Sequence, residues 1–121
     1  MKKRINIVIK NKSKKIKIKD VKKVSLIEEG IGLMFRKRES CPAMLFEFKY
    51  PNKMLIHSLF VFFEFGAVWL DNKNRIVDMK IVKPFMLSVS SRKNFYKLLE
   101  IPLNKKYKKE IKILFKKSNY S

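Results

Sequence analysis

Isoleucine recurs at every second position along the first part of the chain. Ile5, Ile7 and Ile9 alternate with Asn6, Val8 and Lys10, and the segment 15–19 reads Lys-Ile-Lys-Ile-Lys. A period of two is typical of a strand with one buried face. Asn11, Lys12 and Ser13 between the two segments favour a turn. The pattern therefore predicts a hairpin over residues 1–19 with lysines on its exposed face. Such a row also protects an edge strand from mispairing, so it need not bind anything.

The rest of the chain predicts further strands and one short helix. Ser25 and Glu28 fit a capping box, which predicts a helix from about Leu26 to Gly32. Aromatic and β-branched runs, bounded by turn residues, favour strands. These runs are Met44–Phe48, Met54–Phe63, Ala67–Asp71, Arg75–Val82, Tyr96–Ile101 and Glu110–Phe115. About eight strands in 121 residues predict one mainly β domain, a sandwich or closed barrel.

Positive charge is concentrated at the two ends of the sequence. The chain has 30 Lys+Arg against 10 Asp+Glu, a net charge of +20. Residues 1–23 hold eleven basic residues and one acid, and residues 92–121 hold ten basic residues and two acids. The middle, 24–91, has nine basic and seven acidic residues. A nearly neutral centre between two basic ends favours a polyanionic partner, because phosphates relieve the repulsion.

Composition offers a second explanation of the lysines. The chain has no Gln or Thr and is rich in Lys, Ile, Asn and Phe, as an AT-rich genome would encode. Lysine is also enriched in hyperthermophiles, but there it comes with Glu in networks of mixed sign. The excess of one sign favours a ligand over background.

The residues that catalysis usually needs are scarce. His57 is the one histidine and Cys41 the one cysteine, so neither a two-His metal site nor an internal disulfide can form. A Ser-His-Asp set would need Ser58 or Ser88 with His57 and Asp71 or Asp78, without the spacing of a known motif. We expect no enzyme, no cofactor and no bound metal.

Two apolar stretches resemble targeting or membrane segments without completing one. Ile5–Ile9 is too short for the core of a signal peptide. Met54–Leu70 falls short of the ~20 residues of a span and contains His57, Ser58 and Glu64. We expect a cytoplasmic protein without an integral membrane span.

The middle of the chain carries several motifs in a characteristic order. They are Gly32-Leu33-Met34-Phe35-Arg36, Met44–Phe48, Val68-Trp69-Leu70-Asp71, Ile76-Val77-Asp78, Lys83-Pro84 and Leu99-Glu100-Ile101-Pro102. Over about residues 24–103 the chain resembles an archaeal and bacterial family known as domain of unknown function 192. The resemblance implies a compact jelly-roll-like β-domain and no particular activity. The family's usual Asp before the Trp-Leu-Asp segment is replaced by Gly66, so a family site that uses it would be lost here.

Two hypotheses about function follow. The first is a non-enzymatic module that docks on structured RNA, as a ribosomal or other ribonucleoprotein component, through the segments 1–23 and 104–121. Lysine suits phosphate neutralisation, whereas base readout more often uses Arg. The proposed contacts are Lys2, Lys3, Arg4, Lys12, Lys14, Lys15, Lys17, Lys105, Lys106, Lys108, Lys109, Lys112, Lys116 and Lys117. If the two ends of the chain pair, these residues share one face.

The second hypothesis is a small-ligand binder. Arg36, Asp71 and Asp78 are the polar residues of the family-like motifs, and they could line a pocket at one end of a barrel. Internal salt bridges or turn caps are the alternative role for the same residues. A third, weaker option is an anionic membrane surface, which polybasic ends can bind. Truncation to about 24–103 would separate RNA binding from a pocket ligand.

Overall fold

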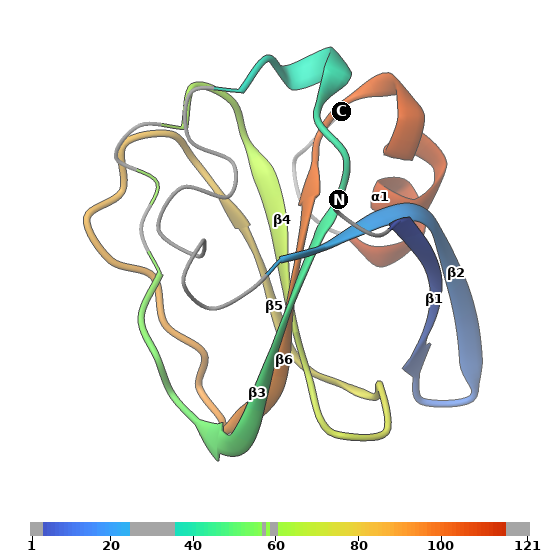
Figure 1. The fold of residues 1–121 in the computed structure, drawn as a ribbon, viewed down its shortest axis with the longest axis vertical. Coiled ribbons are helices and arrows are strands. Elements are labelled where there is room, and N and C mark those ends of the chain that lie inside the picture. Colours follow the sequence, from blue (N-terminus) through green and yellow to red (C-terminus); the bar gives the residue numbers. More distant parts are fainter. Residues whose placement is uncertain (1–3, 25–35, 57, 59–60, 116–121) are drawn as a thin grey trace.

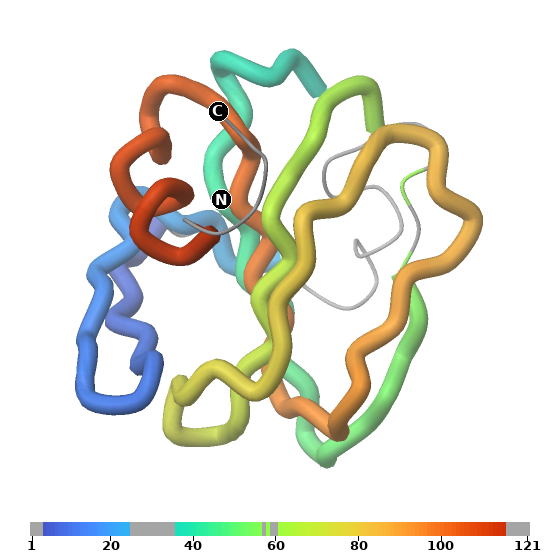
Figure 2. The backbone as a smooth tube through the Cα atoms, turned by 180° about the vertical axis from the view of Figure 1, so that it is seen from behind, coloured from blue at the N-terminus to red at the C-terminus, as the bar shows by residue number. Residues whose placement is uncertain are grey.

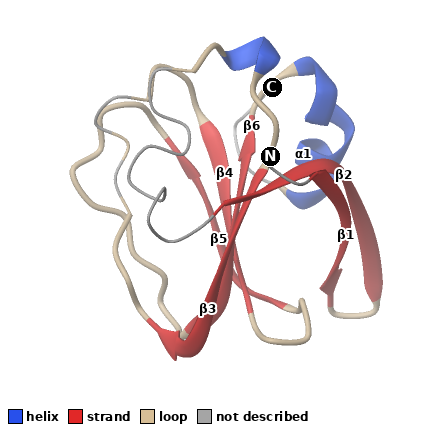
Figure 3. Cartoon of the chain, viewed as in Figure 1, coloured by secondary structure: helices blue, strands red, loops and turns tan. Residues whose placement is uncertain are grey.

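The computed structural model describes residues 4–24, 36–56, 58 and 61–115. Its strands are β1 (Arg4–Asn11), β2 (Lys14–Val24), β3 (Met44–Asn52), β4 (Phe65–Leu70), β5 (Ile76–Val82) and β6 (Phe95–Pro102). They form one mixed sheet in the order β1-β2-β3-β6-β4-β5, in which only the β2–β3 pair is parallel (Figure 1). Two 3₁₀ turns, η2 (Arg38–Ser40) and η3 (Lys105–Tyr107), and one helix, α1 (Lys108–Leu114), complete the described elements (Figure 3).

The predicted hairpin is confirmed. β1 and β2 pair antiparallel, with Ile9 opposite Ile16 and Ile7 opposite Ile18. All four side chains are buried, because the period of two directs them to one face. A bulge follows Ile5 in the register, and Asp20 there has a φ of 53°. A bulge adds local twist and bends the strand. The hairpin accordingly stands away from the remaining strands in Figure 1.

The two edges of the sheet approach one another, so that the sheet curls into a half-barrel. Lys10 on β1 forms an isolated bridge with Arg75, and its amide donates to the carbonyl of Asn74 at 2.8 Å. Asn74 and Arg75 belong to the turn that leads into β5, the opposite edge strand. The curl encloses the first hydrophobic core. It contains Ile7, Ile9, Ile16 and Ile18 of the hairpin, Leu45, Val68, Leu70, Leu99 and Ile101 of the other strands, and Tyr107, Ile111, Leu114 and Phe115 near the C-terminus.

A second core lies on the other face of the central strands. It contains Met44, Phe46, Phe65, Trp69, Phe95 and Leu98 from the sheet, with Ile56, Val61, Phe63 and Val89 from the long connections. The central strands therefore bury side chains on both faces over part of their length, and all six residues of β4 are buried. This explains why β4 reads as an unbroken apolar run.

One predicted strand is wrong. Glu110–Phe115 was expected to be a strand with Ile111, Ile113 and Phe115 on one face, but residues 108–114 form α1. Ile111, Leu114 and Phe115 are buried and Ile113 is exposed, which is the spacing of one helical face. Over residues 110–115 the apolar positions fit both the period of a strand and that of a helix. Packing against the sheet selects the helix.

Other expectations need adjustment. Of the described residues in 54–63, only Ile56 takes part in β pairing, in a single bridge with Val89, so a continuous strand over Met54–Phe63 is wrong. The helix expected at Leu26–Gly32 lies outside the described residues. The mainly β class is confirmed. The described strands form one curled sheet, and a jelly-roll arrangement of two sheets is not seen among them.

Candidate polyanion-binding surface

The exposed side of the hairpin is lined with lysines. Lys15, Lys17 and Lys19 are exposed, while Ile16 and Ile18 between them are buried. Lys12 occupies the turn with a φ of 59°, and Lys14 begins β2. The alternation seen in the sequence thus separates the charge from the core on one strand.

The C-terminal lysines are carried by a helix anchored at its start. The side-chain oxygen of Asn104 accepts a hydrogen bond from the amide of Tyr107, which caps the first turn. The Asn104 amide nitrogen donates to the carbonyls of Arg38, at 2.7 Å, and Cys41, at 3.0 Å. This buried residue therefore fixes where α1 begins relative to η2. Lys105, Lys106, Lys108, Lys109 and Lys112 are exposed along η3 and α1.

Tyr107 joins the two basic segments. Its hydroxyl donates to the carbonyl of Asp20, at 3.0 Å, and accepts from the amide of Ala43, at 2.9 Å. The Asp20 carboxylate forms ion pairs with Lys106 and, at 2.9 Å, with Arg4. Hairpin and helix consequently lie side by side, as the views from front and back both show (Figures 1 and 2). The two ends meet through packing of the helix on the hairpin, and not through the strand pairing that the sequence left open.

A groove of about 750 Å³ runs between the hairpin and α1. It is lined by Asn6, Lys14, Lys15, Ile16, Lys17, Lys19, Lys109, Glu110 and Ile113. Five of these side chains are ammonium groups and one is a carboxylate. Ammonium groups are point charges on flexible stems, suited to phosphate oxygens in any orientation. The groove can therefore hold a polyanion without reading its sequence.

Positive charges crowd the end of this surface near Asp20. Partial burial lowers the pKa of Lys106, and the charges of Arg4 and Lys19 lower it further. A single carboxylate, Asp20, pairs with two cations there. An anionic ligand near these groups would gain the interaction energy that the mutual repulsion now costs.

The structure thus unites much of the predicted RNA-binding set. Lys14, Lys15, Lys17 and Lys109 line the groove, and Arg4 and Lys106 lie beside it around Asp20. Lys12, Lys105, Lys108 and Lys112 are exposed on the flanking turn and helix. Lys2, Lys3, Lys116 and Lys117 lie outside the described residues.

Arg36, Asp71 and Asp78 are not brought together into one pocket. Asp71 lies in the β4–β5 turn, where its carboxylate accepts from the amides of Lys73 and Arg75 and pairs with the Arg75 guanidinium at 2.7 Å. Figure 1 shows this turn at one end of the sheet and the segment from Arg36 into η2 at the opposite end. Burial tends to raise the pKa of Asp71, but these hydrogen bonds outweigh it and the pKa is lowered. Asp71 therefore acts as a turn cap.

Asp78, whose side chain is buried on β5, forms an ion pair with the exposed side chain of Arg92. Its carboxylate accepts from the amides of Met79 and Arg92 and from the Arg92 guanidinium, at 2.8–3.0 Å. Burial works to raise the pKa of Asp78, yet the bonds from Arg92 and Met79 prevail and lower it. Arg92 belongs to the connection between β5 and β6, so the pair fastens this connection to the sheet. Nothing in the sequence signalled Arg92 as the partner, because the two residues are fourteen positions apart.

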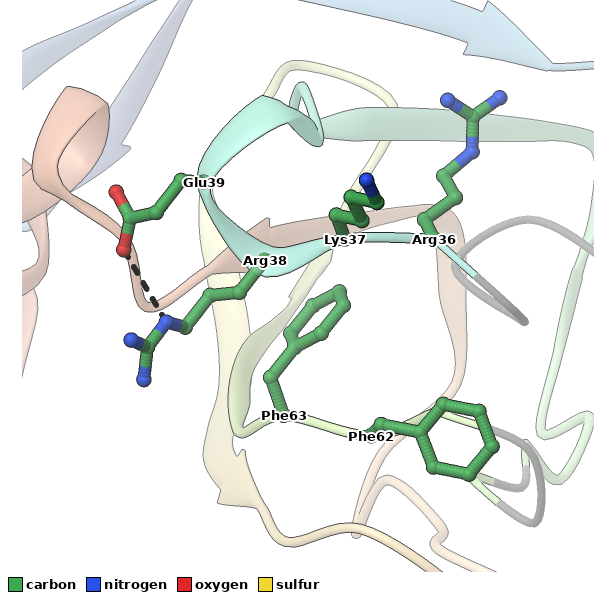
Figure 4. A pocket seen from close by; sticks show the side chains of 6 residues that line it. All are labelled: Arg36, Lys37, Arg38, Glu39, Phe62 and Phe63. Carbon is green, nitrogen blue, oxygen red and sulfur yellow. Dashed lines mark hydrogen bonds and ion pairs between the residues drawn. The ribbon is translucent and has the colours of Figure 1, made fainter.

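A shallow pocket of about 590 Å³ does border Arg36. It is lined by Arg36, Lys37, Arg38, Glu39, Phe62 and Phe63. Glu39 pairs with Arg38 at 3.1 Å, and the Arg36 guanidinium extends away from the two phenyl rings (Figure 4). Phe63 belongs to the second core, whereas Phe62 is 58% exposed. This pocket combines cations with an aromatic wall and excludes both Asp71 and Asp78.

The Cys41 thiol and the Ser58 hydroxyl, which could serve as nucleophiles, have structural roles. Burial raises the pKa of the Cys41 thiol to about 11, so the thiolate is rare near neutral pH. The Ser58 hydroxyl donates to the carbonyl of Lys83 and accepts from the amide of Met86. Within the described ranges, no three His, Cys, Asp or Glu side chains gather as a metal site would require. His57 lies outside those ranges. Among the described helices, none has the length and apolar character to cross a bilayer.

Two solved structures share this fold. A proposed transcription regulator from Sinorhizobium meliloti 1021 is 17% identical, covers 91% of this chain and 86% of its own length, and has a TM-score of 0.71. A protein of unknown function from Novosphingobium aromaticivorans DSM 12444 is 14% identical, covers 88% of this chain and 77% of its own length, and has a TM-score of 0.70. At this identity the likeness concerns the fold alone. No curated protein matches the sequence.

The family match covers almost all of the described fold. The DUF192 family, described as "Uncharacterized ACR, COG1430", matches residues 7–113. The match is longer than the segment 24–103 on which the sequence resemblance rested, because it includes the hairpin and most of α1. The lysines of β2 and of η3 and α1 therefore lie within the matched segment. On this evidence, the chain belongs to the DUF192 family.

Proposed function

We propose that this protein is a non-enzymatic binding module that docks on structured RNA, as a component of a ribosome or another ribonucleoprotein. The observation that carries the proposal is the groove between the hairpin and α1, where five lysines from separate parts of the chain line one surface. Lysine contacts would neutralise phosphates and follow the shape of the nucleic acid, with little dependence on base sequence.

The test is binding to a structured ribosomal RNA fragment across a salt series, with heparin and duplex DNA as controls. DNA is the more informative control, since one structure of similar fold is that of a proposed transcription regulator. We expect binding that persists at physiological salt and prefers the RNA. Equal affinity for all three polyanions would mean that the groove binds them only by nonspecific electrostatic attraction.

A charge-matched pair of variants locates the surface. Lys14, Lys15, Lys17 and Lys109, all in the groove, are changed to Gln in one variant. Lys49, Lys53, Lys73 and Lys83, exposed outside the groove, are changed to Gln in the other. Because each phosphate contact contributes roughly 0.7–0.9 to the slope of log K against log salt, the groove variant should lose about three from that slope. The control should change little. An equal loss in both variants would contradict a localised site.

These substitutions replace truncation as the experiment. Removing residues 1–23 and 104–121 would delete Ile7, Ile9, Ile16, Ile18 and the buried side of α1, which form much of the first core. Loss of binding in such a fragment would report unfolding as readily as loss of contacts.

The second candidate function is a small-ligand binder at the pocket beside Arg36. Three consecutive cations, Arg36, Lys37 and Arg38, line this pocket together with two phenyl rings, a combination that suits a small anion with an aromatic ring. A thermal-shift series with nucleotides, on wild type and the Phe62→Ser variant, tests it. Stabilisation of wild type that disappears in the variant would favour this function. No change in the melting temperature with any nucleotide would contradict it.

A further inference from the structure

Two long connections pair with one another on the side of the molecule away from the hairpin. Ile56 and Val89 exchange two backbone hydrogen bonds, of 3.0 and 2.7 Å. Ser58 extends the pairing, since its amide donates to the carbonyl of Met86 and its carbonyl accepts from the amide of Phe85. Figure 2 shows both connections at the edge opposite to β1, β2 and α1.

These connections expose several large apolar side chains. Leu55 is 57% exposed, Phe62 58%, Phe85 59%, Met86 42% and Leu87 79%. The rings of Phe62 and Phe85 are in contact, with centroids 5.7 Å apart. We call these five residues the apolar loop patch. Single exposed apolar residues are ordinary, but contiguous ones on a soluble protein mark an interaction site.

Phe85 is held in a conformation that its side chain disfavours. Its φ is 66°, in the left-handed region, where a bulky residue is an outlier that costs roughly 1–3 kcal/mol. The 2.7 Å hydrogen bond from its amide to Ser58 and the Phe62 ring contact hold it there. The strain directs a phenyl ring to solvent, where the ring gains little burial within this chain. Strain of this kind is concentrated at functional sites.

The surroundings of the patch indicate its partner. Residues 49–64 and 80–94 contain Lys49, Lys53, Lys80, Lys83, Arg92 and Lys93 against a single acid, Glu64. A second copy of this chain would bring like charges together across the interface. The patch consists of Phe, Leu and Met, without the Tyr, Trp or Arg that anchor protein interfaces. Hydrocarbon side chains with a lysine rim match acyl chains beneath anionic headgroups.

We propose that the apolar loop patch inserts into the interface of a membrane that contains anionic lipids. The side chains of Phe85 and Leu87 would enter the boundary between headgroups and acyl chains, and Lys53 and Lys83 would contact lipid phosphates. Such attachment is peripheral, and it uses a surface separate from the groove. Its success or failure is therefore independent of RNA binding.

The experiment measures binding of the full chain to vesicles of phosphatidylcholine with about one third phosphatidylglycerol, by sedimentation at physiological salt. Leu87→Ser removes apolar surface without changing charge, and we expect its affinity to fall at least tenfold. Phe85→Gly removes the ring and suits the positive φ, so it should weaken binding while thermal stability is kept or raised. Val8→Ser is the matched control, because Val8 is an aliphatic residue of β1 that is 43% exposed and lines neither the groove nor the patch. This control should bind as wild type.

Three results would overturn the proposal. One is the absence of vesicle binding by wild type. Another is wild-type affinity in both patch variants, which would mean adsorption through lysines alone. The third is a dimer in sedimentation equilibrium that Leu87→Ser dissociates, because the patch would then cover a second copy.

Discussion

Gly66 lies where two elements pack so closely that there is little room for a side chain. A Cβ built at this position of β4 would lie 2.7 Å from a ring carbon of Phe115, directly after α1, and 3.4 Å from Ile111. A larger side chain at this point would meet the same ring. The absence of a side chain at Gly66 therefore allows α1 and Phe115 to pack closely on β4.

Gly66→Ala should destabilise the protein by about 1–3 kcal/mol, because the ring of Phe115 must move to accept the methyl group. Urea unfolding measures this. In a Phe115→Ala background the clash is absent, so the same change should be neutral or stabilising, since Ala suits a strand better than Gly. Equal costs in both backgrounds would show that the close approach to Phe115 is not responsible.

The ion pair of Asp78 with Arg92 should make the unfolding free energy depend on pH. The pKa of Asp78 is lower in the folded protein than the ~3.9 of an unfolded Asp. Its stabilising contribution is therefore complete above about pH 4 and is lost as the pH falls through the folded pKa. Asp78→Asn should lower the unfolding free energy by about 1–3 kcal/mol at neutral pH, with a difference from wild type that shrinks below pH 4.

Unfolding titrations of both proteins between neutral and acid pH check the prediction. Glu47→Gln serves as the control, because Glu47 is an exposed residue that pairs with Lys23 and Lys97 at the surface. Surface pairs contribute little, so this variant should stay close to wild type throughout. A difference for Asp78→Asn that does not depend on pH would contradict the role of the charge.

At the scale of elements, Tyr107 joins the hairpin, β3 and the C-terminal helix. Its buried hydroxyl satisfies the amide of Ala43 and the carbonyl of Asp20 at once. Tyr107→Phe would leave both backbone groups without this partner, at a cost of about 1–3 kcal/mol. Relative to wild type, we expect amide hydrogen exchange in this variant to accelerate in β1 and β2. Exchange in β4 and β5, which have no contact with the hydroxyl, should change little.

Tyr50→Phe is the control, because Tyr50 is 76% exposed and its hydroxyl faces solvent. Exchange that accelerates evenly over the whole sheet in Tyr107→Phe would show a loss of global stability in place of a loosened hairpin. That result would also weaken the view that the groove depends on this hydrogen bond for its shape.

At the scale of the molecule, the net charge of +20 acts on stability as well as on binding. Repulsion among unpaired lysines opposes the compact state, and salt screens it within a Debye length of about 10 Å at 0.1 M. The melting temperature should therefore rise from low salt to about 0.3 M NaCl. A structured RNA that binds the folded state should raise it further at equal ionic strength, through mass action.

Scanning calorimetry in the two conditions checks both parts. The variant with Gln at Lys49, Lys53, Lys73 and Lys83 should melt at a higher temperature in low salt and respond less to added salt. A melting temperature that falls with salt would mean that surface ion pairs outweigh the repulsion.

Local patterns were enough to predict the hairpin and most strands. Ile16 and Ile18 among lysines, and the turn at Lys12, define a strand period and its end without help from the remaining chain. The same alternation correctly placed Lys15, Lys17 and Lys19 on the exposed face of β2, since charged side chains stay in water. The motifs of the middle segment also identified the family.

Only the tertiary structure decided the features that depend on distant partners. Residues 110–115 fit both a strand and a helix, and the space between β4 and the hairpin selected the helix. Arg36, Asp71 and Asp78 do not share a pocket, because the fold pairs Asp71 with Arg75 in the β4–β5 turn and Asp78 with Arg92 in the connection between β5 and β6. Phe62 and Phe85 became exposed for a similar reason, through pairing of two connections that no periodicity records. Local secondary structure follows from each residue's own preference for water or core. Contacts between residues far apart in the sequence depend on how the sheet curls.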